Sequence, residues 1–346
     1  MAFVMAAVGD IVVTRPLDKS LNKPGVAATV RVLRGVDHVV GNLEIPLCAA
    51  GRQQEKLVAH HATPEIVPYL ARMGFGSLVL ANNHAMDFGP EGLLETISHL
   101  KEAGIEVIGA GENLPEAVRP RYVGNQEARV AIFALSALLP LGAAAAEDRP
   151  GIAPIRVETS YHIDPNLLLE QPGTPPVVHT MIREDDFMHV ARVVEGCRQR
   201  ADYVVAFIHW GVGMQQARAQ YQVQLGRRLV EAGIDVVVGC HPHTIQEIDR
   251  HRGGYVFYNL GEFFSQYPKE GLPPEVLELL SKLQPEGCVL KLAFAKGHPI
   301  GIEVIPLKID EDGDPTLEGA ERVLAKIASL CGVDYRIKDE ILHVGG

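Results

Sequence analysis

The stretch ARAQYQVQLGRRLVEAGIDVVVGCHPH, residues 217–243, contains the two patterns that decide the fold. Apolar residues in its first half recur at helical spacing, and Gly233 is of the type that most often ends a helix. The second half is a β-branched apolar run, as in strands that are buried on both faces. A helix that passes directly into such a strand indicates an α/β protein with parallel strands.

The same alternation recurs along most of the chain. Further helical patterns occupy residues 63–74, 89–104 and 183–201, and strand patterns occupy residues 2–8, 37–44, 76–83, 105–111, 129–136 and 202–210. From about residue 244 hairpins turned by Gly-Gly and Gly-His-Pro are expected, followed by a helix over 317–330. We therefore predict one α/β domain, residues 1–346, with a mixed sheet or two stacked sheets.

The segment 140–180 departs from this pattern. It is rich in Pro, Ala and Gly and shows only weak periodicity. Long segments of this kind are often functional loops. We predict a lid or insertion loop here, with a disordered excursion as the alternative.

Composition restricts the class of partner and the cellular setting. The net charge of −11 argues against nucleic acid, because a phosphate backbone requires a basic face. The five cysteines form no CxxC pair, which favours reduced thiols over disulfides or a zinc ribbon. The apolar N-terminus lacks a basic n-region and no run of 18 apolar residues occurs, so we expect a cytoplasmic protein without a membrane span. Assembly into a homo-oligomer stays open.

Polar residues gather where the predicted strands end. In an open α/β sheet the carboxyl ends of parallel strands meet at one crevice, so these side chains are expected to converge. They are Asp10, Asn42, Glu44, Asn82, Asn83, His84, His209, His241 and His243.

The chemistry of this set indicates a metal centre. About six nitrogen and oxygen ligands are too many for one tetrahedral zinc ion and suit two ions a few ångströms apart. Each residue also has a simpler explanation. Asp10 could cap a helix or turn, Asn42 and Glu44 could serve a turn, and His209 could be a core histidine. Their joint placement at strand ends favours the metal centre.

The motifs GNLE (41–44), LANNHAMDFGPEGL (80–93), GCHPH (239–243) and YNLGEFF (258–264) resemble those of the CapA-like family. This family of capsule or poly-gamma-glutamate synthesis proteins looks like a branch of the calcineurin-like metallophosphatases. The resemblance implies a four-layer α-β-β-α sandwich with a dinuclear metal centre. From the ligand chemistry we expect two divalent ions, with Mn, Zn or Fe placed first. The implied ligands are Asp10, Glu44, Asn83, His209, His241 and His243.

The resemblance also implies an active-site histidine at His84. Asp87 is placed to orient His84 and raise its basicity, or alternatively to cap the helix that begins near Pro90. We assign substrate binding to residues expected around the crevice: Asn42, Asn82, His61, Trp210 and Glu262.

Several positions depart from the family pattern. Val12 stands where the wider superfamily has the histidine of Asp-x-His, so one metal site is weaker or takes a harder ion. Glu262 stands where the family has the Asn of GNF, and Gly213 where it has Glu. His60 and His61 replace a Phe-Arg pair, so His61 is either a new substrate contact or an exposed loop residue.

These features predict a metal-dependent hydrolase. A metal-bound hydroxide would attack a glutamyl-type amide or a phosphoester in a small or peptide-like substrate, while His84 stabilises the oxyanion or protonates the leaving group. A metal-dependent epimerase that removes a proton next to a carbonyl is the first alternative. A non-catalytic metal-binding subunit of polymer biosynthesis is the second.

Overall fold

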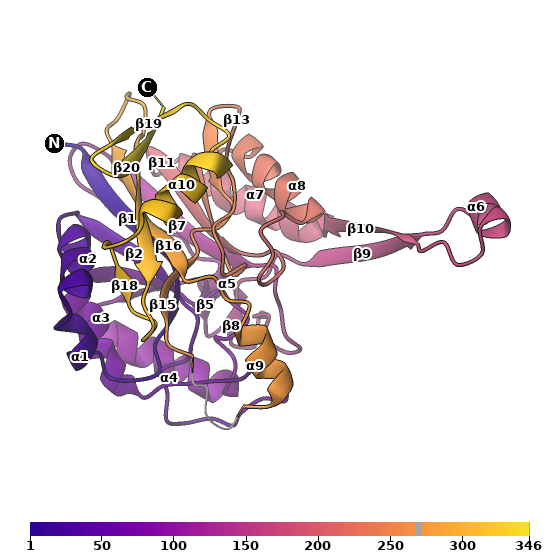
Figure 1. Cartoon of the computed structure of the whole chain (residues 1–346), viewed down its shortest axis with the longest axis horizontal. Coiled ribbons are helices and arrows are strands. Elements are labelled where there is room, and N and C mark those ends of the chain that lie inside the picture. The colour runs from indigo at the N-terminus through magenta and orange to yellow at the C-terminus, as the bar shows by residue number, and fades with distance from the viewer. Residues whose placement is uncertain (268–271, 346) are drawn as a thin grey trace.

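The computed structural model describes residues 1–267 and 272–345 of the chain. Two large sheets dominate it (Figure 1). In the first sheet the strand order is β19-β20-β17-β16-β1-β2-β3-β4, with β15 paired to β1 and β18 to β17. Its strands are β1 (Phe3–Val12), β2 (His38–Leu43), β3 (Phe75–Val79), β4 (Glu106–Ile108), β15 (Glu262–Ser265), β16 (Glu286–Phe294), β17 (Gly301–Ile309), β18 (Pro315–Thr316), β19 (Tyr335–Lys338) and β20 (Ile341–Val344).

In the second sheet the order is β13-β14-β12-β11-β7-β6. Its strands are β6 (Arg121–Gly124), β7 (Arg129–Ser136), β11 (Tyr203–His209), β12 (Val236–Cys240), β13 (Ile248–His251) and β14 (Gly254–Phe257). Both sheets are mixed. In the first sheet β1, β2, β3 and β4 run parallel to one another, while β1 pairs antiparallel with β16. In the second, β7, β11, β12 and β14 run parallel to one another, while β6 and β13 pair antiparallel at its two edges.

The side chains of the central strands alternate between core layers, as the twofold period of a strand requires. In β1, Met5 belongs to the apolar layer between the two sheets, and Ala6 belongs to the layer beneath the helices of the first sheet. In β11, Val205 faces the same inter-sheet layer, and Val204 faces the helices of the second sheet. Three core layers separate four structural layers, so the predicted α-β-β-α sandwich is confirmed.

Helices cover the outer face of each sheet. On the first sheet lie α2 (Pro24–Arg34), α3 (Val67–Met73) and α4 (Gly89–Glu102), and on the second lie α7 (Glu184–Arg198) and α8 (Gln220–Glu231). The remaining helices are α1 (Asp18–Leu21), η1 (Pro64–Ile66), α5 (Leu114–Ala117), α6 (Pro165–Glu170), α9 (Pro274–Leu280) and α10 (Glu321–Leu330). The helices predicted over 63–74, 89–104, 183–201, 217–233 and 317–330 all form, although 63–74 begins as the η1 turn.

Both predicted hairpins are confirmed as the antiparallel pairs β13–β14 and β16–β17. The strand predicted over 105–111 is wrong in its extent, because it divides into β4 and β5 (Ala110–Gly111). Gly109 lies between them with φ of +83°. A Cβ on this residue would lie 2.5 Å from the Cβ of Ala81. The strand is therefore interrupted at a position where only glycine fits.

The segment 140–180 contains β8 (Gly151–Ile152), β9 (Val157–His162), α6 and the start of β10 (Val177–Ile182). Strands β9 and β10 pair antiparallel and project from the body as an arm with α6 at its end (Figure 1). Its role as a lid stays a prediction. Of the helices in the described residues, none combines the length and the apolar character needed to cross a membrane.

Candidate metal centre

The predicted ligands converge at the carboxyl ends of strands from both sheets. Asp10 lies near the end of β1, and Glu44 follows the last residue of β2. His209 ends β11, while His241 and His243 directly follow β12. Residues more than 200 positions apart therefore meet in one buried place, because both sheets direct the carboxyl ends of their parallel strands toward it.

Glu44 is shared by two groups of ligand atoms. One atom each from Glu44, His209 and His241 lie within 4.8 Å of one another, and so do atoms from Asp10, Glu44 and His243. Glu44 Oε1 is 3.2 Å from His209 Nε2 and 4.0 Å from His243 Nε2. A carboxylate common to two such groups is the arrangement expected of a bridging ligand between two ions.

The bonding of these atoms fits bound cations. Both oxygens of Glu44 and Nδ1 of His241 and His243 are buried without a hydrogen-bond partner. Asp10 is better satisfied, since it accepts hydrogen bonds from Asn42 Nδ2 at 2.8 Å and from the backbone N–H of His241 at 3.0 Å. Buried carboxylates without partners are costly unless a cation compensates them.

The pKa shifts of the buried groups also indicate a site that favours a bound cation. Burial, reinforced by Glu44, raises the pKa of Asp10 well above its usual value. Burial lowers the pKa of His241 to about 3. Burial also disfavours the charged form of His243, but the carboxylates of Glu44 and Glu262 outweigh this and raise its pKa to about 10. A proton on His243 thus balances part of a concentrated negative charge that a divalent ion would balance more fully.

The loop after β12 has an unusual backbone. His241 has φ of +97° and His243 has φ of +53°. Residues other than glycine rarely adopt positive φ, and the surrounding structure must compensate the strain. Gly239, just before them, is required for close packing, because a Cβ there would lie 1.9 Å from the carbonyl oxygen of Tyr258. Such strain is typical of functional loops.

The asparagines of the NNH motif have different surroundings. Asn83 Oδ1 is 2.7 Å from His209 Nε2, so it faces the same group of ligand atoms. Asn82 is fully buried and donates to Asn42 Oδ1 and to the carbonyl of Leu43. Its own Oδ1 accepts from the backbone N–H of His84. Asn42 and Asn82 therefore hold the centre's loops in place from within.

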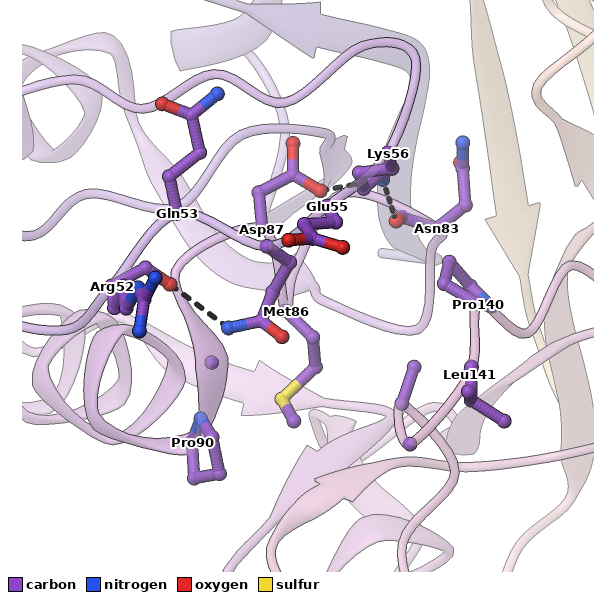
Figure 2. Close-up of a pocket in the computed structure, with 14 residues that line it drawn as sticks. Arg52, Gln53, Glu55, Lys56, Asn83, Met86, Asp87, Pro90, Pro140 and Leu141 are labelled. Atoms are coloured by element: carbon purple, nitrogen blue, oxygen red, sulfur yellow. Dashed lines mark hydrogen bonds and ion pairs between the residues drawn. The ribbon is translucent and has the colours of Figure 1, made fainter.

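His84 and Asp87 form a second polar group beside the centre. His84 Nδ1 is 2.7 Å from Asp87 Oδ2. Lys56 Nζ donates to Asp87 Oδ1 at 2.5 Å and to the carbonyl of Asn83 at 2.7 Å (Figure 2). Helix α4 has Phe88 at its N-cap position without a side-chain cap, so the alternative of Asp87 as a helix cap is wrong. The ring of His60 stacks on His84 at 4.3 Å.

Two cavities adjoin this group and share Lys56 and Asn83. One, of about 450 Å³, is lined by His84, His241, His243 and by apolar side chains that include Met214 and Leu280. The other, of about 640 Å³, is more polar and includes Arg52, Gln53 and Glu55 (Figure 2). A substrate in the first cavity would lie against three imidazoles of the site.

The remaining predicted substrate contacts lie at different depths. His61 is exposed and packs against Phe88 with ring centroids 4.1 Å apart. Trp210 is fully buried, and its Nε1–H donates to the carbonyl of Tyr258, which makes it a core residue. Glu262 is also fully buried and lies 2.9 Å from Nδ1 of His243, inside the centre instead of at its rim.

Sequence reasoning missed Lys56 and gave His60 no role of its own. Both lie in a stretch without regular secondary structure between β2 and η1, and their partners Asp87 and His84 belong to another loop. Such contacts depend on the path of the loop and leave no periodic signal in the sequence.

A class of protein follows from this geometry: an α-β-β-α sandwich with a histidine and carboxylate centre at its strand ends. The family description "Bacterial capsule synthesis protein PGA_cap" matches residues 4–267. The chain therefore belongs to this family, the CapA family of the metallophosphatase-like superfamily.

Two sequence relatives agree with this assignment. The chain is 30% identical over 267 residues to "Capsule biosynthesis protein CapA" of Bacillus anthracis, covering 75% of this chain but only 59% of that protein. It is 30% identical over 293 residues to a Mycobacterium tuberculosis protein named "Probable polyglutamine synthesis accessory protein", covering 82% of this chain and 69% of that protein. A hypothetical Thermus thermophilus protein of known structure shares 14% identity at a TM-score of 0.46, covering 90% and 96% of the two chains.

Proposed function

We propose that the chain is a metal-dependent hydrolase with a dinuclear centre. The observation that carries the proposal is Glu44, whose unpartnered oxygens are common to both groups of ligand atoms. Asp10 and His243 would hold one ion, and Asn83, His209 and His241 the other. When bound, two divalent ions lower the pKa of water and stabilise negative charge that develops on the substrate.

The chain's own residues supply the proton chemistry. His84 lines the cavity next to the proposed ligands, and its Nδ1 faces Asp87. Asp87 accepts from Nδ1–H and fixes the ring, so the imidazolium form of His84 would present Nε2–H to a leaving group and give up that proton. Lys56 holds Asp87 in turn, and the stacked His60 restricts the rotation of the His84 ring.

The names of the relatives favour an amide substrate. Relatives are named for capsule biosynthesis and for polyglutamine synthesis. We therefore place a glutamyl-type amide first and a phosphoester second. The test is turnover of γ-glutamyl oligomers and of aryl phosphoesters by protein reconstituted with Mn²⁺ or Zn²⁺.

The informative variant is His84→Asn. Loss of a general acid should lower kcat by roughly 10²–10⁴-fold, with the bound metal unchanged. His99→Asn on the partly exposed face of α4 is the matched control and should keep full activity. Full turnover by His84→Asn would exclude the assigned role of His84. Solvent deuterium in recovered substrate without cleavage would instead identify the epimerase.

A non-catalytic role is the second candidate, because the relative from Mycobacterium tuberculosis is named an accessory protein. In that case the centre would bind polymer without cleaving it. Metal-dependent binding of poly-γ-glutamate, together with no turnover in the assays above, would support this role.

The cytoplasmic location stays a prediction, in keeping with five free thiols.

A further inference from the structure

Glu262 faces the centre from a strand that the predicted ligand set did not include. Strand β15 pairs in parallel with β1, and Glu262 is the register partner of Asp10. Both side chains are 0% exposed. A third buried carboxylate is thus placed beside Asp10 by the backbone pairing itself, which fixes its position more firmly than a loop would.

The oxygens of Glu262 are as poorly satisfied as those of Glu44. Neither oxygen has a hydrogen-bond partner. Oε1 lies 2.9 Å from His243 Nδ1, but the contact lacks the alignment of a hydrogen bond. Asp10 Oδ2 lies 3.5 Å from the same nitrogen, so two carboxylates converge on one edge of one ring.

The described residues offer little positive charge to balance these groups. Within 1–267 and 272–345, every basic group at ion-pair distance from Asp10, Glu44 or Glu262 is a histidine ring. Three buried carboxylates whose basic neighbours in the described residues are imidazole rings alone favour a further cation.

We propose that Glu262 is a ligand of the ion held by Asp10, Glu44 and His243. The two sites of the proposed dinuclear centre, on which this inference rests, then differ in chemistry. The Glu262 site offers three carboxylates and one imidazole, a set that suits Mn²⁺ or Mg²⁺. The other site offers His209 and His241 with Asn83 and the shared Glu44, a set that suits Zn²⁺ or Fe²⁺.

Mixed-metal loading tests the inference without any substrate. Metal-free full-length protein is supplied with one equivalent of Zn²⁺ and an excess of Mn²⁺, and bound ions are counted by mass spectrometry and by the electron paramagnetic resonance of Mn²⁺. Wild type should hold one ion of each kind. Glu262→Gln should weaken Mn²⁺ binding by more than about 100-fold, beyond the roughly 10–100-fold that loss of an orienting partner alone produces.

Two further variants complete the experiment. Glu262→His should still hold two ions but exchange Mn²⁺ for Zn²⁺, because imidazole replaces a carboxylate. Glu303→Gln on β17 removes a carboxylate that is paired with Lys291 of β16 and lies outside the ligand loops, and it should behave as wild type. Thermal unfolding verifies that each variant is folded.

The possible failures are distinguishable. If wild type holds fewer than two ions, the dinuclear centre itself is wrong and the inference falls with it. If wild type holds two ions but Glu262→Gln changes Mn²⁺ affinity by 100-fold or less, the centre stands and Glu262 is not a ligand.

Discussion

Two clusters of carboxylates in the described residues are balanced in opposite ways. At the strand ends, Glu44 and Glu262 have unpartnered oxygens surrounded by histidines. In the turn after β17, ligand atoms of Asp310, Asp312 and Asp314 also lie within 4.8 Å of one another. There, however, the ammonium group of Lys23 lies 2.8, 2.6 and 2.7 Å from the three carboxylates.

The difference shows that a count of acidic residues does not identify a metal site. Oδ1 of the fully buried Asp314 accepts from Ser20 and Gln266. Its Oδ2 has no aligned hydrogen bond but lies 2.7 Å from the ammonium group of Lys23, so the charge is compensated by that cation. At the strand ends the described residues supply only imidazoles, which are themselves metal ligands. The protein thus uses its own lysine as the cation in one cluster, and we propose a metal ion in the other.

The largest expected effect comes from removing the shared carboxylate. Glu44→Gln should abolish both ions at micromolar metal, a loss of more than about 100-fold in affinity, because both groups of ligands depend on it. Asp314→Asn, an acid-to-amide change in the other cluster, should retain two ions. Equal metal content in the two variants, measured by mass spectrometry, would remove the distinction between the clusters.

Removing the lysine should reverse the behaviour of the second cluster. Lys23→Met leaves Asp314 buried without its cation and should lower the free energy of unfolding by about 1–3 kcal/mol. This is less than for a fully buried pair, because Lys23 is 30% exposed. Added Ca²⁺ should then restore the melting temperature of the variant, since three carboxylates become available to it.

In wild type the same addition of Ca²⁺ should leave the melting temperature unchanged, because Lys23 already balances the three carboxylates. The comparison is made on protein whose strand-end centre is already loaded with metal, so that only the second cluster responds. A variant as stable as wild type, with no response to Ca²⁺, would show that Lys23 is not the balancing charge.

Much of the first cluster was predictable because its members follow strands. Asp10, Glu44 and His209 terminate apolar runs, and parallel topology then requires them to meet. The partner of Asp314 was not predictable, because Lys23 lies 291 positions away, just before α2, and no pattern joins the two segments. The position of Glu262 was likewise missed, since the pairing of β15 with β1 is long-range and brief.

The next smaller effect is the pH dependence of metal affinity, which is expected at the strand-end centre. With a pKa of about 10, His243 carries a proton at neutral pH, which an incoming ion must displace. Affinity at the strand ends should therefore rise about tenfold per pH unit between pH 7 and 9 and level off above about 10. His241, with a pKa of about 3, is neutral throughout this range and adds no slope.

Calorimetry in buffers of different ionisation enthalpy measures this proton release directly. About one proton should leave per ion bound at the Asp10 site at pH 8. A flat affinity over pH 7–9 would mean that His243 is already neutral before the ion binds.

The smallest effect on metal content is expected at Asp87, a buried carboxylate outside both clusters that, like Asp314, has a lysine partner. Asp87→Asn should retain two ions within about threefold of wild-type affinity, while turnover falls by roughly 10–100-fold because His84 is no longer held. A loss of metal equal to that in Glu44→Gln would place Asp87 inside the centre after all.

The central claim is that one carboxylate, Glu44, joins two ions at the strand ends. Anomalous X-ray diffraction from crystals grown with Mn²⁺ and Zn²⁺ tests it most directly, because each ion is located at its own absorption edge. We predict two peaks about 3.5–4 Å apart with Glu44 between them, and none at Asp310, Asp312 and Asp314. A single peak, or two peaks that do not share Glu44, would contradict the account.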